Sequence, residues 1–212
     1  MLFGGEKAVL GLPVTTEVGR RLPKEAFYRH MSVDAATRRD LTAGVAAITV
    51  ANSIKPTTAN IADGKTVHEI LVLKIDPKGE RVPERAVRLV SGATPNKAVV
   101  VDGGSGVVSI CEKGRLLETQ DVEHLDLNGF DLDTVWDSIL AQVALGEFDG
   151  HNVWARIERR ETINGLRAEV AALDAKARRE RQIARKNELF ALMKKKQAEL
   201  RRLEEEWQSW IR

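Results

Sequence analysis

The stretch KAVVVDGGSGVVSICEKGRLLETQDVEHL, residues 97–125, decides how the fold of this chain is interpreted. Three short runs of β-branched and apolar residues alternate in it with two glycine-containing turns, DGGSG and EKG. Such runs, separated by short glycine turns, are typical of consecutive antiparallel strands. We therefore predict three neighbouring strands in a β-sheet.

The segments before this stretch predict two helices. PKEAFYRHM starts with Pro23, which suits the first position of a helix. Asp34 is a suitable N-cap for a second helix. The apolar residues after Asp34 recur at helical spacing as far as Pro56, where we expect this helix to end. They are Leu41, Val45 and Ile48.

A further strand and two more helices complete the body of the protein. KTVHEILVLKID, residues 65–76, is rich in β-branched residues and predicts a strand. PERAVRLV, residues 83–90, indicates a short helix with Pro83 at its start. Asp131 can cap a final helix. Its buried stripe is expected to consist of Val135, Trp136, Ile139, Leu140 and Val143.

The predicted order of elements, α-α-β-α-β-β-β-α, lacks strict alternation of strands and helices, so a doubly wound fold is not expected. We predict an α+β fold with a small, mostly antiparallel sheet that is covered by helices. A C-terminal helical hairpin of the coiled-coil type is expected to follow it.

The charge of the chain changes at GEFDG, residues 146–150, where two glycines flank an acidic turn. Residues 151–212 contain 16 Lys and Arg against 10 Asp and Glu, whereas residues 1–150 contain 17 against 21. We therefore predict two domains, an acidic globular body over residues 1–150 and a basic helical arm over residues 151–212.

The arm contains a single glycine, Gly165, and no proline between Val153 and Trp210. Its apolar pattern lapses between Arg178 and Gln182, so the chain is either one long helix or a hairpin. We favour an antiparallel hairpin, because folding back would let two apolar seams cover each other, with Ile183 as an anchor at the tip. The seams are Ile163, Leu166, Val170, Leu173 and Ala177, and Ile183, Phe190, Met193, Gln197, Leu200 and Trp207.

No apolar run approaches the ~18 residues that a membrane span requires. The single cysteine, Cys111, excludes an intramolecular disulfide and fits a reducing compartment. We therefore expect a cytoplasmic protein with no membrane partner, in which Cys111 is a buried, inert thiol.

Four stretches follow one another along the chain. They are PVTTEVGRRLPKEAFY, IKPTTANIADGKTVHEILVLKI, LDLNGFDLDTVWDSILAQV and RQIARKNELFALMKKKQAEL. In this order they resemble a bacterial family of domains of unknown function. Its genes often neighbour those of DNA methyltransferases and helicases in restriction-modification or phage-defence clusters. The resemblance implies methyltransferase or helicase subunits as partners and a setting near DNA, and it implies no catalytic residue.

The sequence contains no strong signature of catalysis. The best acidic cluster surrounds His124 in DVEHLDLNG, and we interpret it as a strand end with solvated acids and not as a metal site. Asp63, Glu69 and Lys74 follow the order of the acids and lysine of restriction-type nucleases. Glu69 and Lys74, however, point to opposite faces of a strand. We expect a protein that is not an enzyme, with no metal or cofactor.

Basic side chains gather between Lys176 and Arg202, where eleven Lys and Arg occur with three acids. Arg178, Arg181 and Arg185 recur at helical spacing and would share a face of a continuous helix. Such a stripe of cations suits contact with phosphates, and its alternative is a solvated helix face. The predicted nucleic-acid-binding residues are Arg178, Arg179, Arg181, Arg185 and Lys186.

The C-terminal EEEWQSWIR indicates a second kind of contact. Tryptophan often anchors protein interfaces, so Trp207 and Trp210 are the predicted partner-interface residues. The alternative is that they pack against the body or near Trp154.

The favoured hypothesis is a non-catalytic accessory subunit of a DNA restriction-modification or phage-defence system, which docks to larger partners and offers its arm to the DNA backbone. The competing hypothesis makes the hairpin a protein–protein interaction or self-association module. The third is a divergent metal-dependent nuclease that uses Asp63 and Glu69. The sequence leaves open whether the arm's partner is DNA or an acidic protein, and it leaves the oligomeric state open.

Overall fold

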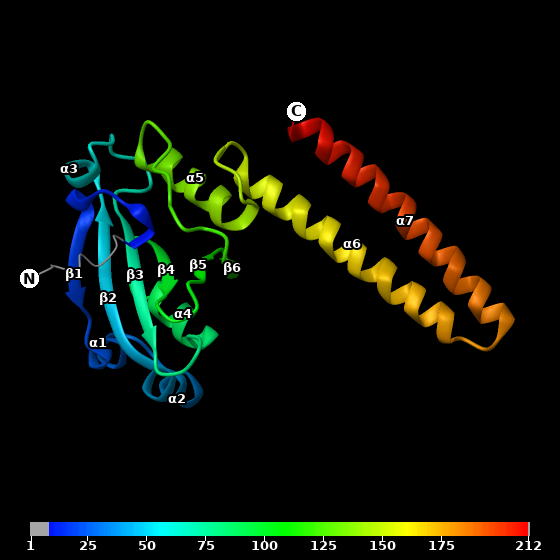
Figure 1. The fold of residues 1–212 in the computed structure, drawn as a ribbon, viewed down its shortest axis with the longest axis horizontal. Helices are drawn as coiled ribbons and strands as arrows, with labels where there is room; N and C mark the ends of the chain where they lie inside the picture. Colours follow the sequence, from blue (N-terminus) through cyan, green and yellow to red (C-terminus); the bar gives the residue numbers. More distant parts are fainter. Residues whose placement is uncertain (1–8, 212) are drawn as a thin grey trace, which may run out of the picture. The chain divides into compact units, whose positions relative to one another are not determined.

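The computed structural model describes residues 9–211, apart from the side chains of His30 and of residues 209–211. These residues form two compact units, which divide between Val153 and Trp154. The first unit contains a six-stranded sheet with its helices, and the second is a pair of long helices (Figure 1).

The described part of the first unit consists of short 3-10 turns, five α-helices and six strands. The 3-10 turns are Val9–Gly11 and Val14–Thr16. The helices and strands are β1 (Glu17–Arg21), α1 (Lys24–His30), α2 (Ala35–Gly44), β2 (Val45–Ile54), α3 (Pro56–Ala59), β3 (Ile70–Pro77), α4 (Glu84–Ser91), β4 (Lys97–Asp102), β5 (Val108–Glu112), β6 (Arg115–Thr119) and α5 (Leu132–Leu145).

The strands lie in the sheet in the order in which they occur along the chain. Every neighbouring pair is antiparallel except β3 and β4, which are parallel. Parallel neighbours need a crossover, and α4 supplies it between these two strands. The predicted class, an α+β fold with a mostly antiparallel sheet and covering helices, is confirmed.

The three strands predicted within residues 97–125 are confirmed as β4, β5 and β6. Glu112 pairs with Arg115 across a two-residue turn of Lys113 and Gly114, whose φ angles are 49° and 74°. Positive φ at both central positions gives a turn whose twist matches that of the flanking strands. Asp102 ends β4, and its buried carboxylate accepts the N–H groups of Val82 and Gly104 at 2.8 Å each.

The second helix is shorter than predicted. Asp34 caps α2 as expected and accepts the N–H of Thr37 at 2.9 Å, but α2 ends at Gly44 and Val45 begins β2. β2 pairs with β1 on one side and β3 on the other. It is buried along most of its length, so its apolar residues lack the alternation of a half-exposed strand. The helical spacing of Leu41, Val45 and Ile48 is therefore a coincidence.

The edge strand β1 is absent from the predicted order of elements. All five of its residues, EVGRR, are exposed, so they carry no hydrophobic pattern. β1 exists because its backbone pairs with β2, for example Arg20 with Val50 and Arg21 with Thr49. Pairing of this kind leaves no trace in a side-chain pattern.

Helices cover both faces of the sheet. Leu73 and Val100 belong to a buried cluster with Leu41 of α2 and Val87 of α4, so these helices lie on one face. The opposite face carries Val99 and Ile110. Lys97 and Glu112 lie two residues from them along the same strands and therefore on the same face. Trp136 of α5 donates its indole N–H to Glu112 at 2.7 Å and lies beneath the Lys97 ammonium. α5 therefore covers this second face, and its predicted stripe is buried throughout: Val135, Trp136, Ile139, Leu140 and Val143.

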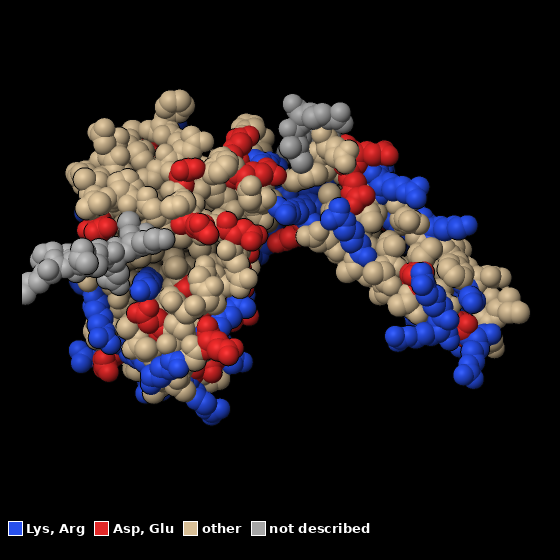
Figure 2. Space-filling view, viewed as in Figure 1, with Lys and Arg blue, Asp and Glu red and all other residues tan. Residues whose placement is uncertain are grey.

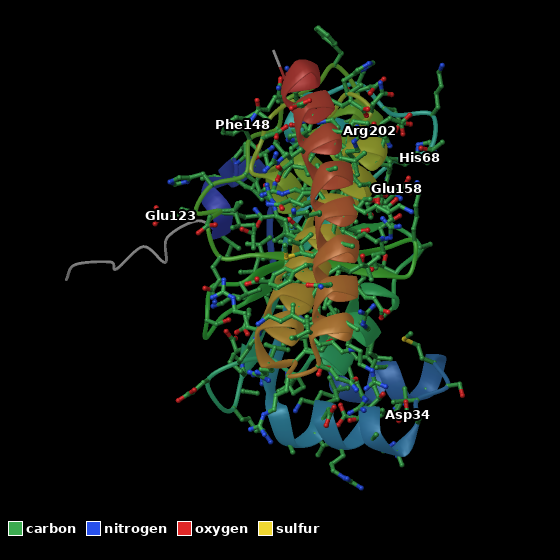
Figure 3. The ribbon with its side chains drawn as sticks, turned by 90° about the vertical axis from the view of Figure 1, so that its right-hand side faces the viewer. Asp34, His68, Glu123, Phe148, Glu158 and Arg202 are labelled. Carbon is green, nitrogen blue, oxygen red and sulfur yellow. The ribbon has the colours of Figure 1, made fainter. Side chains whose placement is uncertain are left out.

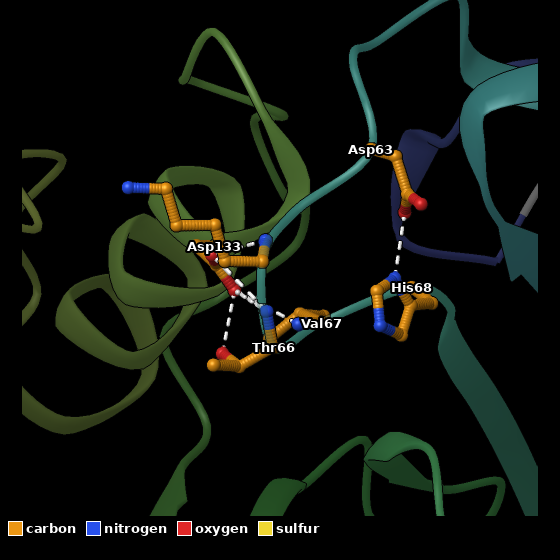
Figure 4. Close-up of polar contacts among 6 residues, drawn as sticks. Asp63, Thr66, Val67, His68 and Asp133 are labelled. Carbon is orange, nitrogen blue, oxygen red and sulfur yellow. Dashed lines mark hydrogen bonds and ion pairs between the residues drawn. The ribbon is translucent and has the colours of Figure 1, made fainter.

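The first turn of α5 is tied to the loop that leads into β3 (Figure 4). Asp131 caps α5 by accepting the N–H of Thr134 at 2.8 Å. The Asp133 carboxylate accepts the backbone N–H groups of Lys65 and Val67 at 2.7 and 2.8 Å and the Thr66 hydroxyl at 2.7 Å. The Thr66 hydroxyl bond and these N–H groups lower the pKa of Asp133 from 3.8 to about 2.

The second unit consists of α6 (Val153–Arg179), apart from its first residue, and α7 (Ile183–Ile211). The two helices pack together and are joined by residues 180–182. The expected C-terminal helical hairpin is thus confirmed, and the alternative of one continuous helix is excluded. No helix of the described residues is both long enough and apolar enough to cross a membrane.

We expect Asp133→Asn to lower the free energy of unfolding of the body by about 1 kcal/mol at neutral pH, because an amide accepts these hydrogen bonds more weakly than a carboxylate. A depressed pKa stabilises the fold only while the carboxylate is ionised. The difference from wild type should therefore be full above pH 3.8 and should fade as the pH falls to about 2.

Thermal and urea unfolding at several pH values measure this difference. Asp63→Asn is the matched control, because the Asp63 carboxylate pairs only with the exposed His68 ring in the described residues. Equal destabilisation by both substitutions would contradict the role of Asp133.

Candidate nucleic-acid interface

The turn of the hairpin forms without glycine or proline. The Glu180 N–H donates to Lys176 at 3.1 Å and continues the pattern of α6, while Lys186 donates to Gln182 at 2.9 Å and begins that of α7. The Glu180 carboxylate accepts the Gln182 N–H at 2.9 Å, and this bond holds the pKa of Glu180 below its usual value. A side chain at the turn thus satisfies a backbone donor that the start of α7 leaves free.

The apolar seam lies between the two helices, but its tip differs from the prediction. Ile163, Leu166 and Ala177 of α6 are buried, whereas the expected anchor Ile183 is 77% exposed. Ile183 is the first residue of α7, and the short turn orients it away from α6. The described seam residues of α7 are half-buried and begin beyond Ile183: Lys186, Leu189, Phe190, Met193, Gln197, Leu200, Leu203 and Trp207.

Ion pairs connect the two helices away from the turn. Arg167 contacts Glu204 at 2.6 Å, and Arg159 contacts Glu206. Nearer the turn, Lys196 of α7 contacts Glu169 of α6 at 3.0 Å. The acids close to the end of α7 therefore neutralise arginines of α6 in the part of the arm that lies far from the tip.

The cations at the tip have few acidic partners. Arg178 is exposed and pairs with Asp174, one turn earlier on α6, at 2.8 Å. The other four predicted residues form no ion pair within the described part of the chain. They are Arg179, Arg181 and Arg185, which are exposed, and Lys186, which is half-buried.

The predicted shared helix face of Arg178, Arg181 and Arg185 is wrong. Arg178 lies in the last turn of α6, Arg181 lies in the turn between the helices and Arg185 belongs to the first turn of α7. Their spacing assumed a continuous helix, which the turn interrupts. The three guanidinium groups come from consecutive segments around one tip, so they surround it and do not form a stripe.

The two tryptophans of the tail belong to the last turns of α7. Trp207 lies half-buried on the seam side of α7, one turn beyond Leu203. The side chain of Trp210 lies outside the described residues. Figure 3 shows the side chains that project from α7, Arg202 among them.

The candidate nuclease residues each have a separate partner. Asp63 contacts His68 at 3.0 Å, and Lys74 contacts Asp76 at 3.3 Å. Glu69 accepts hydrogen bonds from the Ser53 hydroxyl and, at 2.5 Å, from the Asn96 amide. The three side chains do not converge. Among the residues that the structure describes, no group of three or more His, Cys, Asp or Glu could hold a metal ion.

A second basic surface was missed by the sequence reasoning. It lies at the end of the body that β1, α1 and α2 form, and its cations are spread from Arg20 to Lys78 along the chain. The two Arg-Arg pairs, at 20–21 and 38–39, are the local signal that could have indicated it. The acidic balance of the body as a whole concealed them.

We expect Ala177→Leu to destabilise the arm by about 1 to 3 kcal/mol, because Ala177 is completely buried where α6 meets α7 and a larger side chain must displace the helix. Thermal unfolding followed by circular dichroism measures the loss. Ala175→Leu places the same side chain at an exposed position two residues away and should have little effect. Equal stability of the two variants would be inconsistent with this packing.

No curated protein and no solved structure matches the chain. A family model does match, over residues 10–113 and 105–200. The matches span both the body and most of the hairpin. The chain therefore belongs to the family described as Domain of unknown function (DUF4391).

Proposed function

We propose that this protein is a non-catalytic accessory module that contacts the phosphate backbone of nucleic acid through the tip of its helical hairpin. The observation that carries the proposal is the gathering of exposed arginines around the turn of the hairpin. Arg179, Arg181 and Arg185 come from the end of α6, the turn and the start of α7, and none of them forms an ion pair in the described residues. Exposed arginines of this kind suit phosphate oxygens, which accept paired N–H donors.

The geometry of the tip favours contact with the backbone over recognition of bases. Phe190 is the nearest aromatic residue of α7, and it is half-buried on the seam side. Without exposed rings, base stacking contributes little, so single strands are not the preferred ligand. Backbone contacts by themselves carry no sequence information and weaken steeply as salt rises.

The non-catalytic role is supported by the separation of the candidate nuclease residues. Glu69 is held by Ser53 and Asn96, while Asp63 pairs with His68 elsewhere. A metal-dependent nuclease needs such ligands around one ion. We place the module among methyltransferase or helicase subunits of a restriction-modification or phage-defence system, as the family resemblance implies, in the cytoplasm.

Arg179→Glu, Arg181→Glu and Arg185→Glu together are expected to weaken binding of duplex DNA and to reduce the slope of log affinity against log salt by about 2 to 3, roughly one per lost phosphate contact. Fluorescence anisotropy over a salt series measures both quantities. The matched control reverses three exposed cations farther along α7 that form no ion pair in the described residues: Lys194, Lys195 and Arg201.

The control separates contact by the tip from attraction to the whole arm. The tip variant should lose clearly more affinity than the control variant, although both change the net charge equally. Identical losses would indicate non-specific attraction, and unchanged binding by the tip variant would refute the proposal. Co-purification of the full chain from its host tests the partner enzymes separately.

A further inference from the structure

One end of the body carries a cluster of cations joined by direct contacts. On α1, the Tyr28 hydroxyl lies 3.0 Å from that of Thr42 on α2, and the Arg38 guanidinium stacks 4.5 Å from the centre of the Tyr28 ring. Lys78 donates to the Thr42 carbonyl at 2.8 Å, and Lys24 donates to the carbonyl of Val45. Lys24 and Lys78 thus meet at the C-terminal end of α2, and Arg38 lies one turn before Thr42 on the same helix.

Like charges are concentrated there. Burial, together with the positive charges of Lys78 and Arg21, lowers the pKa of Lys24, although the Glu25 carboxylate opposes this shift. Further arginines extend the cluster over β1, α1 and α2. Arg20, Arg29 and Arg39 are exposed, and none of them forms an ion pair within the described residues.

The nearby acids offset only part of this positive charge, and Glu25 of α1 is the acid that acts on Lys24. Asp34, labelled in Figure 3, caps α2 and accepts from Ala36 and from both the N–H and the hydroxyl of Thr37. Asp40 pairs with Arg85 at 3.2 Å. Figure 2 shows Lys and Arg over β1, α1 and α2, at the lower left of the molecule, with some Asp and Glu among them. The body therefore has a basic end, although residues 1–150 contain more acids than bases.

We propose that this surface, formed by Arg20, Arg21, Lys24, Arg29, Arg38, Arg39 and Lys78, is a second binding surface for the phosphate backbone of a nucleic acid duplex. It belongs to the body and is independent of the tip of the arm. Its contacts would add to those of the tip on the same duplex, or they would hold a second duplex.

The composition of the surface favours a nucleic acid over an acidic protein. Five of its seven cations are arginines, whose planar fork pairs with phosphate oxygens through two hydrogen bonds. Stacking on Tyr28 holds the Arg38 guanidinium in place, which reduces the entropy lost on binding. The described residues of α1 and α2 include no exposed large apolar side chain, and β1 adds only the small side chain of Val18, which is not of the aromatic kind that anchors a protein interface.

The test uses the full chain with Arg29→Glu and Arg39→Glu, two exposed positions without a structural contact in the described residues. We expect roughly tenfold weaker binding of short duplex DNA near physiological salt, and a salt slope smaller by about 2. Lys65→Glu with Arg81→Glu is the control of equal charge change elsewhere on the body, and it also removes the ion pair of Arg81 with Glu118. Circular dichroism checks the fold. Arg29→Gln with Arg39→Gln removes the same two phosphate contacts without adding negative charge, so it should reduce the slope by a similar amount and the affinity by less.

The binding measurements decide whether the body surface holds a nucleic acid duplex. Duplex RNA in parallel shows which source of the phosphate backbone the surface prefers. Unchanged duplex binding, or a loss no greater than that of the control, overturns the proposal. Tighter binding of polyglutamate than of either duplex, lost in the same variant, also overturns it in favour of an acidic protein.

Combination with the tip variant separates the two proposals. If only the tip variant weakens binding, the arm remains a nucleic-acid interface and the body surface is refuted. If only the body variant does so, the body surface stands and the role of the tip falls. Additive losses in the combined variant support both surfaces.

Discussion

The parallel pairing of β3 with β4 is the constraint on which the rest of the body depends. A tight hairpin cannot connect parallel neighbours, so the chain leaves the sheet and returns through α4. α4 then shares one face with α1 and α2, and the buried residues of that face hold these helices together. α5 takes the opposite face, where Asp133 ties it to the loop before β3. The basic end of the body exists because this arrangement brings α1 and α2 beside β1 and the end of β3.

Charge is segregated within each unit more than its totals suggest. In the arm, Glu204 and Glu206 neutralise arginines of α6, whereas three exposed arginines around the tip form no ion pair in the described residues. In the body, Asp34 and Asp40 are engaged in capping and pairing, so the arginines around Tyr28 remain available. Both proposed surfaces therefore exist because the acidic side chains of each unit are engaged by other groups. Net charge, which is nearly balanced over the chain, does not reveal either of them.

Local signals predicted several elements because local chemistry is sufficient to form them. The turn at Lys113 and Gly114 sets the β5–β6 hairpin, and Asp131 caps α5 wherever that helix packs. The position of the candidate residues in the fold was also predicted, since Arg179, Arg181 and Arg185 do lie at the tip of a hairpin. The predictions that these arginines share a helix face and that Ile183 anchors the tip were wrong, because a three-residue turn changes the direction of every side chain near it. The spacing of residues along the sequence does not reveal this change of direction.

By itself, the sequence determined the fold class, the four stretches that indicated the family, the strands of residues 97–125 and the basic character of the arm. These depend on composition, turn chemistry and periodicity, which are properties of neighbouring residues. Only the tertiary structure decided that β2 is a strand and that β1 exists, because both depend on backbone pairing between distant segments. It also decided which cations are unpaired. Tyr28 and Lys78 are far apart along the chain, and only packing brings both of them to Thr42, with Arg38 stacked on the Tyr28 ring.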